Sequence, residues 1–194
     1  MKRRRGRGSK HFDLLAPFYD RLMCRSEAVP LAEALNLPSD GVLLDVGGGT
    51  GRVSHALAPW VREVVVCDAS RQMLERARQG GVAIVQGTAE HLPFGDGAIE
   101  RVLVVDALHH FRSQEQAVRE LVRVLAPKGR LLVSEPDTAS ASVRLIAFAE
   151  RLALMDSRFL SPEEIAAIIT AQGLTTRIVR HGTTAWIIAD RQEG

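Results

Sequence analysis

The chain has 194 residues, of which 46% are hydrophobic, 5% aromatic and 25% charged, a composition typical of a globular protein with its own core. This composition excludes disordered and collagen-like chains, and no uncharged apolar stretch reaches the roughly 20 residues that span a bilayer. The formal net charge is +2, and Cys24 and Cys67 have no CxxC partner, so we expect neither a disulfide framework nor a zinc knuckle.

The first elements along the chain are a basic tail and a helical cap. Residues 1–10 hold six basic residues and no acidic one, which leaves 19 bases against 23 acids in residues 11–194. The glycines of the tail offer nothing to bury, so we expect residues 1–10 to be disordered. Residues 11–36 are predicted to be a helical cap on a single α/β domain that spans 11–194.

Short Val/Ile/Leu-rich runs then alternate with stretches of helical spacing. Near-continuous apolar runs of this length are typical of strands buried on both faces. We expect strands over 41–46, 63–67, 82–86, 99–105 and 129–135, and helices over 54–61, 70–79 and 114–126. The alternation predicts a doubly wound, mostly parallel sheet with helices on both faces.

The pattern changes after the fifth strand. Residues 142–155 are predicted to be helical, and Ser161-Pro162-Glu163-Glu164 has the N-cap, proline and acidic first turn that open another helix, which Gly173 ends. Residues 174–190 are two β-branched runs split by His181-Gly182, which predicts a hairpin. The sheet should therefore have seven strands, with one antiparallel strand near its edge.

The segment VLLDVGGGTG, from Val42 to Gly51, carries the clearest chemical signal: a buried strand ends in a glycine-dense turn, and Asp68 ends the next strand. Glycines let a ligand lie against bare backbone, and a carboxylate at the second strand tip is where a ribose is held. A packing role for the turn and an N-cap role for Asp68 are the alternatives. Arg52 stands where a dinucleotide fingerprint needs a small residue, and Asp45 suits a ligand that carries an ammonium group.

At this point the chain resembles the class I S-adenosylmethionine-dependent methyltransferases, in the branch of the ubiquinone/menaquinone biosynthesis C-methyltransferases. The resemblance runs through APFYDRLM (16–23), LLDVGGGTG (43–51), VVVCDAS (64–70), QGTAEHLPF (86–94), VLVVDALHHF (102–111) and LVRVLAPKGRLLVSEP (121–136). It implies a Rossmann-like methyltransferase fold, with S-adenosyl-L-methionine as cofactor and S-adenosyl-L-homocysteine as its product.

The resemblance also implies cofactor-binding residues. Asp45 would lie near the amino group of the methionine moiety, and Asp68 would take the ribose hydroxyls. Thr88 stands where many relatives have an aspartate that accepts a hydrogen bond from the adenine. A threonine hydroxyl can still accept that bond, but without the help of a charge. The implied set is Gly47, Gly48, Gly49 and Gly51 around the methionine, Ala69, Met73, Thr88, Ala89 and Glu90 around the adenine, Asp106, Ala107 and Leu108 near the reacting methyl group, and Tyr19 closing over the cofactor.

His109 and His110 are the candidates for a catalytic base, because a histidine pKa lies near the operating pH. A hydrogen-bonding role in the loop is the alternative, since transfer from an activated sulfonium needs a base only when the acceptor loses a proton. No other histidine has a carboxylate or cysteine in helical register, so no metal site is predicted.

We therefore expect a cytoplasmic methyltransferase that acts on a small organic acceptor, without a membrane span. One alternative is a methyltransferase for RNA or a ribosome-associated substrate, with nucleic acid held by the basic tail. A second is a protein that binds S-adenosylmethionine without catalysis. The sequence does not identify the methyl acceptor or the oligomeric state.

Overall fold

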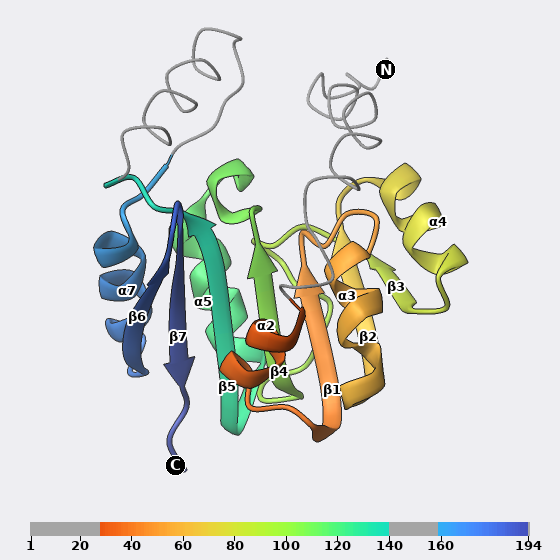
Figure 1. Ribbon diagram of the computed structural model, residues 1–194, viewed down its shortest axis with the longest axis horizontal. Helices are drawn as coiled ribbons and strands as arrows, with labels where there is room; N and C mark the ends of the chain where they lie inside the picture. Colours follow the sequence, from red (N-terminus) through yellow and green to blue (C-terminus); the bar gives the residue numbers. More distant parts are fainter. Residues whose placement is uncertain (1–27, 140–158, 194) are drawn as a thin grey trace, which may run out of the picture.

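The computed structural model describes residues 28–139 and 159–193 (Figure 1). The predictions for the tail 1–10, for Tyr19 and for a helix over 142–155 lie outside the described residues. Of the predicted cap over 11–36, the described part contains one helix, α2 (Ala28–Ala34).

A seven-stranded sheet forms the centre of the fold. Its strands are β1 (Ser39–Val46), β2 (Val61–Asp68), β3 (Ala83–Gln86), β4 (Ile99–Val105), β5 (Leu125–Pro136), β6 (Thr175–His181) and β7 (Thr184–Asp190). They lie in the order β3-β2-β1-β4-β5-β7-β6. The pairs from β3 to β5 are parallel, whereas β7 runs antiparallel to both β5 and β6. In Figure 1 the arrowheads of β1, β4 and β5 point up and that of β7 points down. The predicted fold class is confirmed.

Helices cover both faces of the sheet because successive strand residues point to opposite sides. Leu43 packs with α2, with α3 (Arg52–Leu57) and with α4 (Arg71–Gln79). Its neighbour Leu44 packs on the other face with α5 (Gln114–Val124) and α7 (Pro162–Thr170). Two short 3-10 helices, η2 (Ala58–Trp60) and η3 (Leu108–His110), complete the described elements.

Two predicted helix ends lie elsewhere in the structure. The helix expected over 54–61 ends at Leu57, because Pro59 enters the 3-10 turn η2, and β2 already begins at Val61. The helix expected to end at Ala126 ends at Val124, and the chain passes directly into β5. Arg191 donates from Nη1 to the last carbonyls there, to Val122 at 3.2 Å and Leu125 at 2.6 Å, so the helix end is satisfied by a distant residue.

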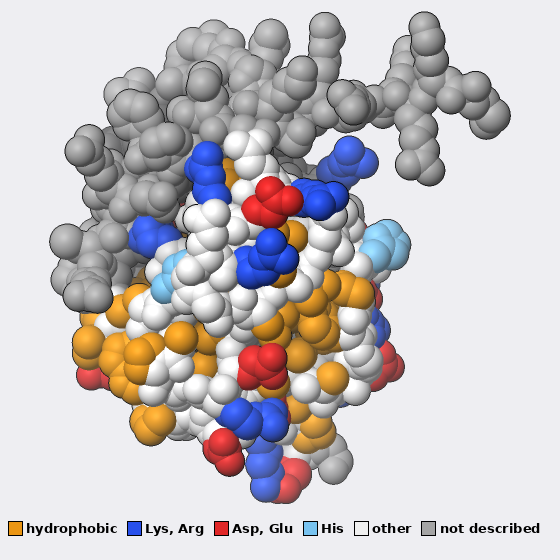
Figure 2. Space-filling view, turned by 90° about the vertical axis from the view of Figure 1, so that its right-hand side faces the viewer, with side chains coloured by type: hydrophobic (Ala, Val, Ile, Leu, Met, Phe, Trp, Pro, Cys, Tyr) orange, Lys and Arg blue, Asp and Glu red, His pale blue; other side chains and the backbone are white. Residues whose placement is uncertain are grey.

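The C-terminal elements follow their sequence signals. Ser161 and Glu164 form a capping box at the start of α7, and Gly173 takes a φ of 87° just after the helix. At the other end of the sheet, β3 is a four-residue edge strand whose first three residues are half-buried. Figure 2 shows this side of the molecule, with hydrophobic side chains exposed between acidic and basic ones.

Candidate functional site

The loops after β1, β2, β3 and β4 meet at the carboxyl edge of the sheet, where the strand order reverses between β1 and β4. Gly47 donates its N–H to the carbonyl of Cys67 at 2.8 Å, and Gly87 donates to the carbonyl of Asp68 at 3.1 Å. These bonds tie the first three loops together. The reversal of strand order is where open α/β sheets bind their ligands.

The glycine turn after β1 needs its glycines for two physical reasons. Gly47 has a φ of 73°, and a Cβ on it would lie 2.7 Å from the Cβ of Ala107 in the loop after β4. Gly49 has a φ of 56°, and the position of its Cβ is open space for 4 Å. The turn thus packs closely on one side and leaves room on the other, which is the shape a backbone-bound ligand requires.

Asp45 is a buried carboxylate at the foot of this turn, with 2% of its surface exposed. Its Oδ2 accepts a hydrogen bond of 2.7 Å from the Ser54 hydroxyl, and its Oδ1 has no partner among the described residues. Burial raises the pKa of Asp45 to about 6, against the smaller opposing effect of the Ser54 bond. A buried acceptor without a partner is costly, and a ligand cation would relieve that cost.

This raised pKa predicts a stability change on Asp45→Asn. Because the folded pKa of about 6 exceeds the ordinary aspartate pKa of 3.8, ionisation of Asp45 lowers folding stability progressively as the pH rises from about 4 to 6. Above that range the loss is complete and amounts to about 3 kcal/mol. Without ligand, the variant should therefore gain in melting temperature over the wild type at pH 7.5 much more than at pH 4.5. Exposed Asp40 supplies the control Asp40→Asn, and a pH-independent difference at position 45 would contradict the prediction.

Asp68 closes the turn from the end of β2. Its Oδ2 accepts from the N–H of Gly49 at 3.0 Å, and its Oδ1 accepts from the N–H of Ser70 at 2.7 Å. Ser70, rather than Asp68, is the N-cap of α4, since the Ser70 hydroxyl accepts from the N–H of Met73. The alternative reading of Asp68 as the helix cap is therefore wrong. Burial raises the pKa of the Asp68 carboxyl.

The residues predicted around an adenine lie on the loops that flank Asp68. The Gln86 amide donates to the carbonyl of Ala69 at 3.1 Å, which joins the loop after β3 to the loop after β2. Met73 and Ala89 are buried, and Glu90 accepts a hydrogen bond from the N–H of Ser113. Thr88 forms an isolated antiparallel bridge with His91. The structure thus brings the predicted segment 88–90 to the same edge as Asp68.

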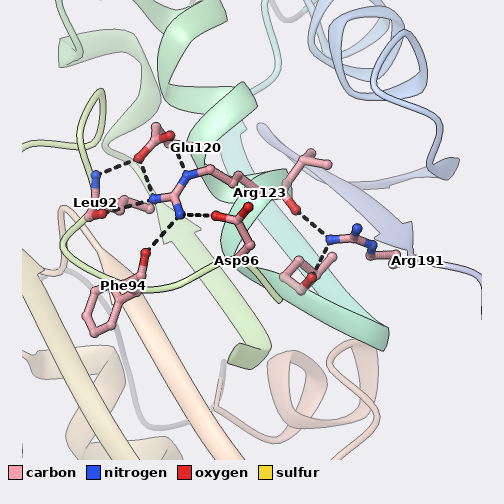
Figure 3. Close-up of polar contacts among 8 residues, drawn as sticks. Leu92, Phe94, Asp96, Glu120, Arg123 and Arg191 are labelled. Carbon is pink, nitrogen blue, oxygen red and sulfur yellow. Dashed lines mark hydrogen bonds and ion pairs between the residues drawn. The ribbon is translucent and has the colours of Figure 1, made fainter. Parts of the chain in front are cut away.

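One arginine fixes the continuation of this loop. The guanidinium of Arg123 donates to the carbonyls of Leu92 at 3.0 Å and Phe94 at 2.9 Å. It also binds the carboxylates of Glu120 and Asp96, each at a closest distance of 2.7 Å (Figure 3). Glu120 in turn accepts from the N–H of Leu92 at 2.9 Å. Two side chains of α5 therefore fix the backbone of the loop at Leu92 and Phe94.

Arg123→Met should therefore destabilise the protein by roughly 1–3 kcal/mol, because it leaves two carbonyls without their donor. Arg123→Lys should restore little, since an ammonium lacks the planar fork that reaches all four partners. The matched control is Arg119→Met on the same helix, whose side chain is exposed and pairs with Glu115 at 3.6 Å; its cost should stay within about 0.5 kcal/mol. Urea unfolding measures all three, and equal costs at 119 and 123 would refute the role of the loop contacts.

The loop after β4 faces the same edge. Asp106 takes a φ of 49°, a left-handed conformation that aspartate tolerates better than most residues. Its N–H donates to the carbonyl of Ser134 on β5 at 2.9 Å. The next two N–H groups, of Ala107 and Leu108, donate to one oxygen of Glu135 at 3.0 and 2.8 Å. Strand β5 therefore sets the position of this loop.

The two histidines of η3 have different surroundings. His109 is buried, and its Nδ1 lies 2.5 Å from the second oxygen of Glu135. Its ring stacks on Phe159, with centroids 4.4 Å apart. Burial, with the neighbouring His109, lowers the pKa of His110 to about 3, so His110 is neutral at physiological pH and a weak proton acceptor.

Glu135 is the residue of this region that the sequence did not single out. The signal was available, because an acidic residue ends the apolar run GRLLVSE in the same way that Asp68 ends VVVCD. Among residues 28–139 and 159–193, no group of three or more His, Cys, Asp or Glu side chains is arranged to hold a metal ion. None of the described helices has the length and apolar character to cross a bilayer.

Comparison with known proteins shows which proteins this chain resembles. Residues 44–133 match the model of a methyltransferase domain. The uncharacterized methyltransferase YcgJ of Bacillus subtilis is 41% identical over 98 residues, which are 47% of this chain and 39% of YcgJ. The ubiquinone/menaquinone biosynthesis C-methyltransferase UbiE of Pseudomonas paraeruginosa is 34% identical over 122 residues, 57% of this chain and 48% of UbiE. These alignments span less than half of either relative.

The fold has solved counterparts as well. The crystal structure of the SAM-dependent methyltransferase TM1293 from Thermotoga maritima superposes with a TM-score of 0.76 at 24% identity, over 93% of this chain and 98% of that one. The match to the methyltransferase-domain model runs from Leu44 within β1 to Val133 within β5, and it contains the glycine turn, Asp68 and the loop of the two histidines. Residues 44–133 are therefore a methyltransferase domain, homologous to those of YcgJ and UbiE and built on the fold of the S-adenosylmethionine-dependent methyltransferases.

Proposed function

We propose that this protein binds S-adenosyl-L-methionine at the carboxyl edge of its sheet and transfers the methyl group to a small organic acceptor. The observation that carries the proposal is the buried Oδ1 of Asp45, which has no partner among the described residues and lies beside an open glycine turn. The ammonium group of a methionine moiety would supply both the missing donor and the missing positive charge. A pyrophosphate at the same turn would add negative charge beside a carboxylate.

The other predicted contacts fit the same ligand. Asp68 keeps acceptor capacity beyond its two backbone bonds, so its carboxylate can take the ribose hydroxyls. Met73 and Ala89 offer apolar surface to an adenine ring, with Ala69, Thr88 and Glu90 on the adjoining loops. Gly47, Gly48, Gly49 and Gly51 would surround the methionine end. Asp106, Ala107 and Leu108 would lie beside the reacting methyl group.

The chain's contribution to such a reaction is alignment and the exclusion of water. The cofactor, when bound, supplies an already activated methyl group on a sulfonium. The residues of this edge therefore need to hold the donor carbon in line with the acceptor atom and to keep the pair dry. The hydrogen bonds from the loop after β4 to Glu135 and Ser134 fix the backbone on the methyl side.

The basic tail supports a second candidate, a methyltransferase that acts on RNA. Residues 1–10 carry six positive charges, whereas residues 11–194 have a small excess of acids. Binding by the tail alone would involve at most about six phosphates, with a log–log salt slope no steeper than about −5. We favour the small-molecule acceptor because the positive charge is confined to those ten residues. A location in the cytoplasm belongs to the same proposal.

The experiment is an acceptor screen with a radiolabelled methyl donor, run on the full chain and on a variant without residues 1–10. The proposal predicts label on a small acceptor, at equal rates for both proteins. Label on RNA that depends on residues 1–10, with S-adenosylmethionine binding intact in the shortened chain, would establish the RNA-directed candidate instead. Binding without any transfer would leave a protein that binds the cofactor without catalysis.

A further inference from the structure

The contacts of Glu135 go beyond what alignment of a methyl donor requires. Its side chain is 4% exposed and lies at the end of β5, within the sheet between β4 and β7. It makes three hydrogen bonds: Oε1 accepts from the N–H groups of Ala107 and Leu108, and Oε2 meets Nδ1 of His109. Burying a carboxylate is costly, and only such a complete set of donors offsets the cost.

Resting on the proposed function, we propose that Glu135 is a positioning residue for proton transfer: it holds His109 as the Nδ1–H tautomer, so that Nε2 accepts a proton from the methyl acceptor. The acceptor then belongs to a defined chemical class. Its nucleophilic atom carries a dissociable proton, as the oxygen of a phenol does, rather than a lone pair that is already available, as on a pyridine nitrogen.

The tautomer follows from the bonding of Glu135. An ionised carboxylate accepts hydrogen bonds and donates none, and Oε1 already accepts two backbone N–H groups. The ring nitrogen at 2.5 Å from Oε2 must therefore carry the proton, which leaves the lone pair of the neutral ring on Nε2. Stacking on Phe159, with an interplanar angle of 17°, holds the ring in this orientation.

The two histidines differ in their suitability as proton acceptors. The titratable groups that contact the His109 ring include Glu135 from β5 and His110 from η3. The carboxylate stabilises a positive charge on His109, as the buried acid does in a Ser-His-Asp triad. Burial, with the neighbouring His109, disfavours the charged form of His110. The base is therefore His109.

The proposed step balances without any further reactant. The acceptor's X–H bond breaks and its proton passes to Nε2 of His109. The freed electron pair on X forms a bond to the methyl carbon, and the carbon–sulfur bond breaks with its electron pair remaining on sulfur. The products are methylated acceptor, S-adenosylhomocysteine and an imidazolium beside the Glu135 carboxylate, which later loses its proton to water.

The substitution Glu135→Gln distinguishes two roles of Glu135: setting the tautomer of His109 and supporting the loop after β4. The glutamine carbonyl can still accept from Ala107 and Leu108, so the loop should keep its place. The glutamine NH₂ would instead donate to Nδ1 of His109, which forces the proton onto Nε2 and removes the proton acceptor. We expect an unchanged affinity for S-adenosylhomocysteine, and a kcat for methylation of catechol that falls by about 10²–10⁴. Glu75→Gln, the same substitution at an exposed position of α4, is the matched control and should retain full activity.

The direct test is the imidazole spectrum of the full chain with S-adenosylhomocysteine bound. Long-range proton–nitrogen correlations on ¹⁵N-histidine protein should show His109 protonated at Nδ1 in the wild type and at Nε2 in Glu135→Gln. Protonation of Nε2 would remove the proton acceptor, so the wild-type rate with catechol should also fall as the pH is lowered. The same tautomer in both proteins, or a pH-independent rate that Glu135→Gln leaves intact, would overturn the inference.

Failure of the inference and failure of the proposed function give different results. Methylation of nicotinamide but not of catechol, unaffected by Glu135→Gln, would keep the methyltransferase and exclude the proton-bearing acceptor. Absence of S-adenosylhomocysteine binding would count against the proposed function itself. The imidazole spectrum without ligand would then still show which nitrogen of His109 carries the proton.

Discussion

Asp68→Ala should weaken the binding of S-adenosylmethionine about ten- to hundredfold. The reason is the loss of hydrogen bonds from the ribose hydroxyls to a carboxylate, which are worth about 1.5–3 kcal/mol. Calorimetric titration of the wild type and the variant measures the change. The exposed acid Glu75 on α4, which pairs with Arg71, provides the control Glu75→Ala with unchanged affinity.

Asp68 also accepts from Gly49 and Ser70, so a loss of affinity alone would not separate ribose binding from support of the turn. Adenosine and 2′,3′-dideoxyadenosine separate the two roles. In the wild type, removal of the ribose hydroxyls should weaken binding, and in Asp68→Ala it should have little further effect. Equal losses in both proteins would show that Asp68 acts on the turn and not on the ribose.

Gly47→Ala should cost about 2–4 kcal/mol of stability and abolish cofactor binding. Its φ of 73° strains any residue with a Cβ, and the new methyl group would lie 2.7 Å from the Cβ of Ala107. Either the turn or the loop after β4 must move, and both belong to the proposed site. Thermal unfolding and titration with S-adenosylhomocysteine measure the two effects.

Gly81→Ala is the matched control for the backbone strain. Gly81 has a φ of 87° between α4 and β3, and no atom lies within 4 Å of the position of its Cβ. Its substitution should cost about 1 kcal/mol and leave binding intact. The contrary result is that Gly47→Ala lowers the free energy of unfolding no more than Gly81→Ala does and still binds S-adenosylhomocysteine. That result would show that the close contact with Ala107 does not matter for stability or binding.

The sequence predicted the strands of this fold well because each is a buried run that alternates with helices. Element ends were less predictable, since they depend on contacts made after folding. The helix expected to end at Ala126 stops at Val124, where Arg191 binds its terminal carbonyls from the far end of the chain. Pro59 was visible, but the 3-10 turn that it occupies before β2 was not predicted.

In the candidate site, too, some features could be predicted from the sequence and others could not. The glycine turn, Asp45 and Asp68 are adjacent to strands in the sequence, so pattern and topology together predicted their meeting. The pairing of His109 with Glu135 joins residues 26 positions apart, one in η3 and the other at the end of β5. The sequence showed that an acidic residue ends the run GRLLVSE, but not which side chain it would bind. Periodicity predicts which residues are buried, but not which buried polar groups bond to each other.

The carboxyl edge of the sheet is the proposed binding site for S-adenosylmethionine. The most direct measurement is calorimetric titration of the full chain with S-adenosylhomocysteine and, separately, with NADH at pH 7.5. We expect one S-adenosylhomocysteine to bind per chain and NADH not to bind. The ammonium group of the first would meet the Asp45 carboxylate, whereas a pyrophosphate would meet the same carboxylate with like charge. Tight binding of NADH without binding of S-adenosylhomocysteine would contradict it.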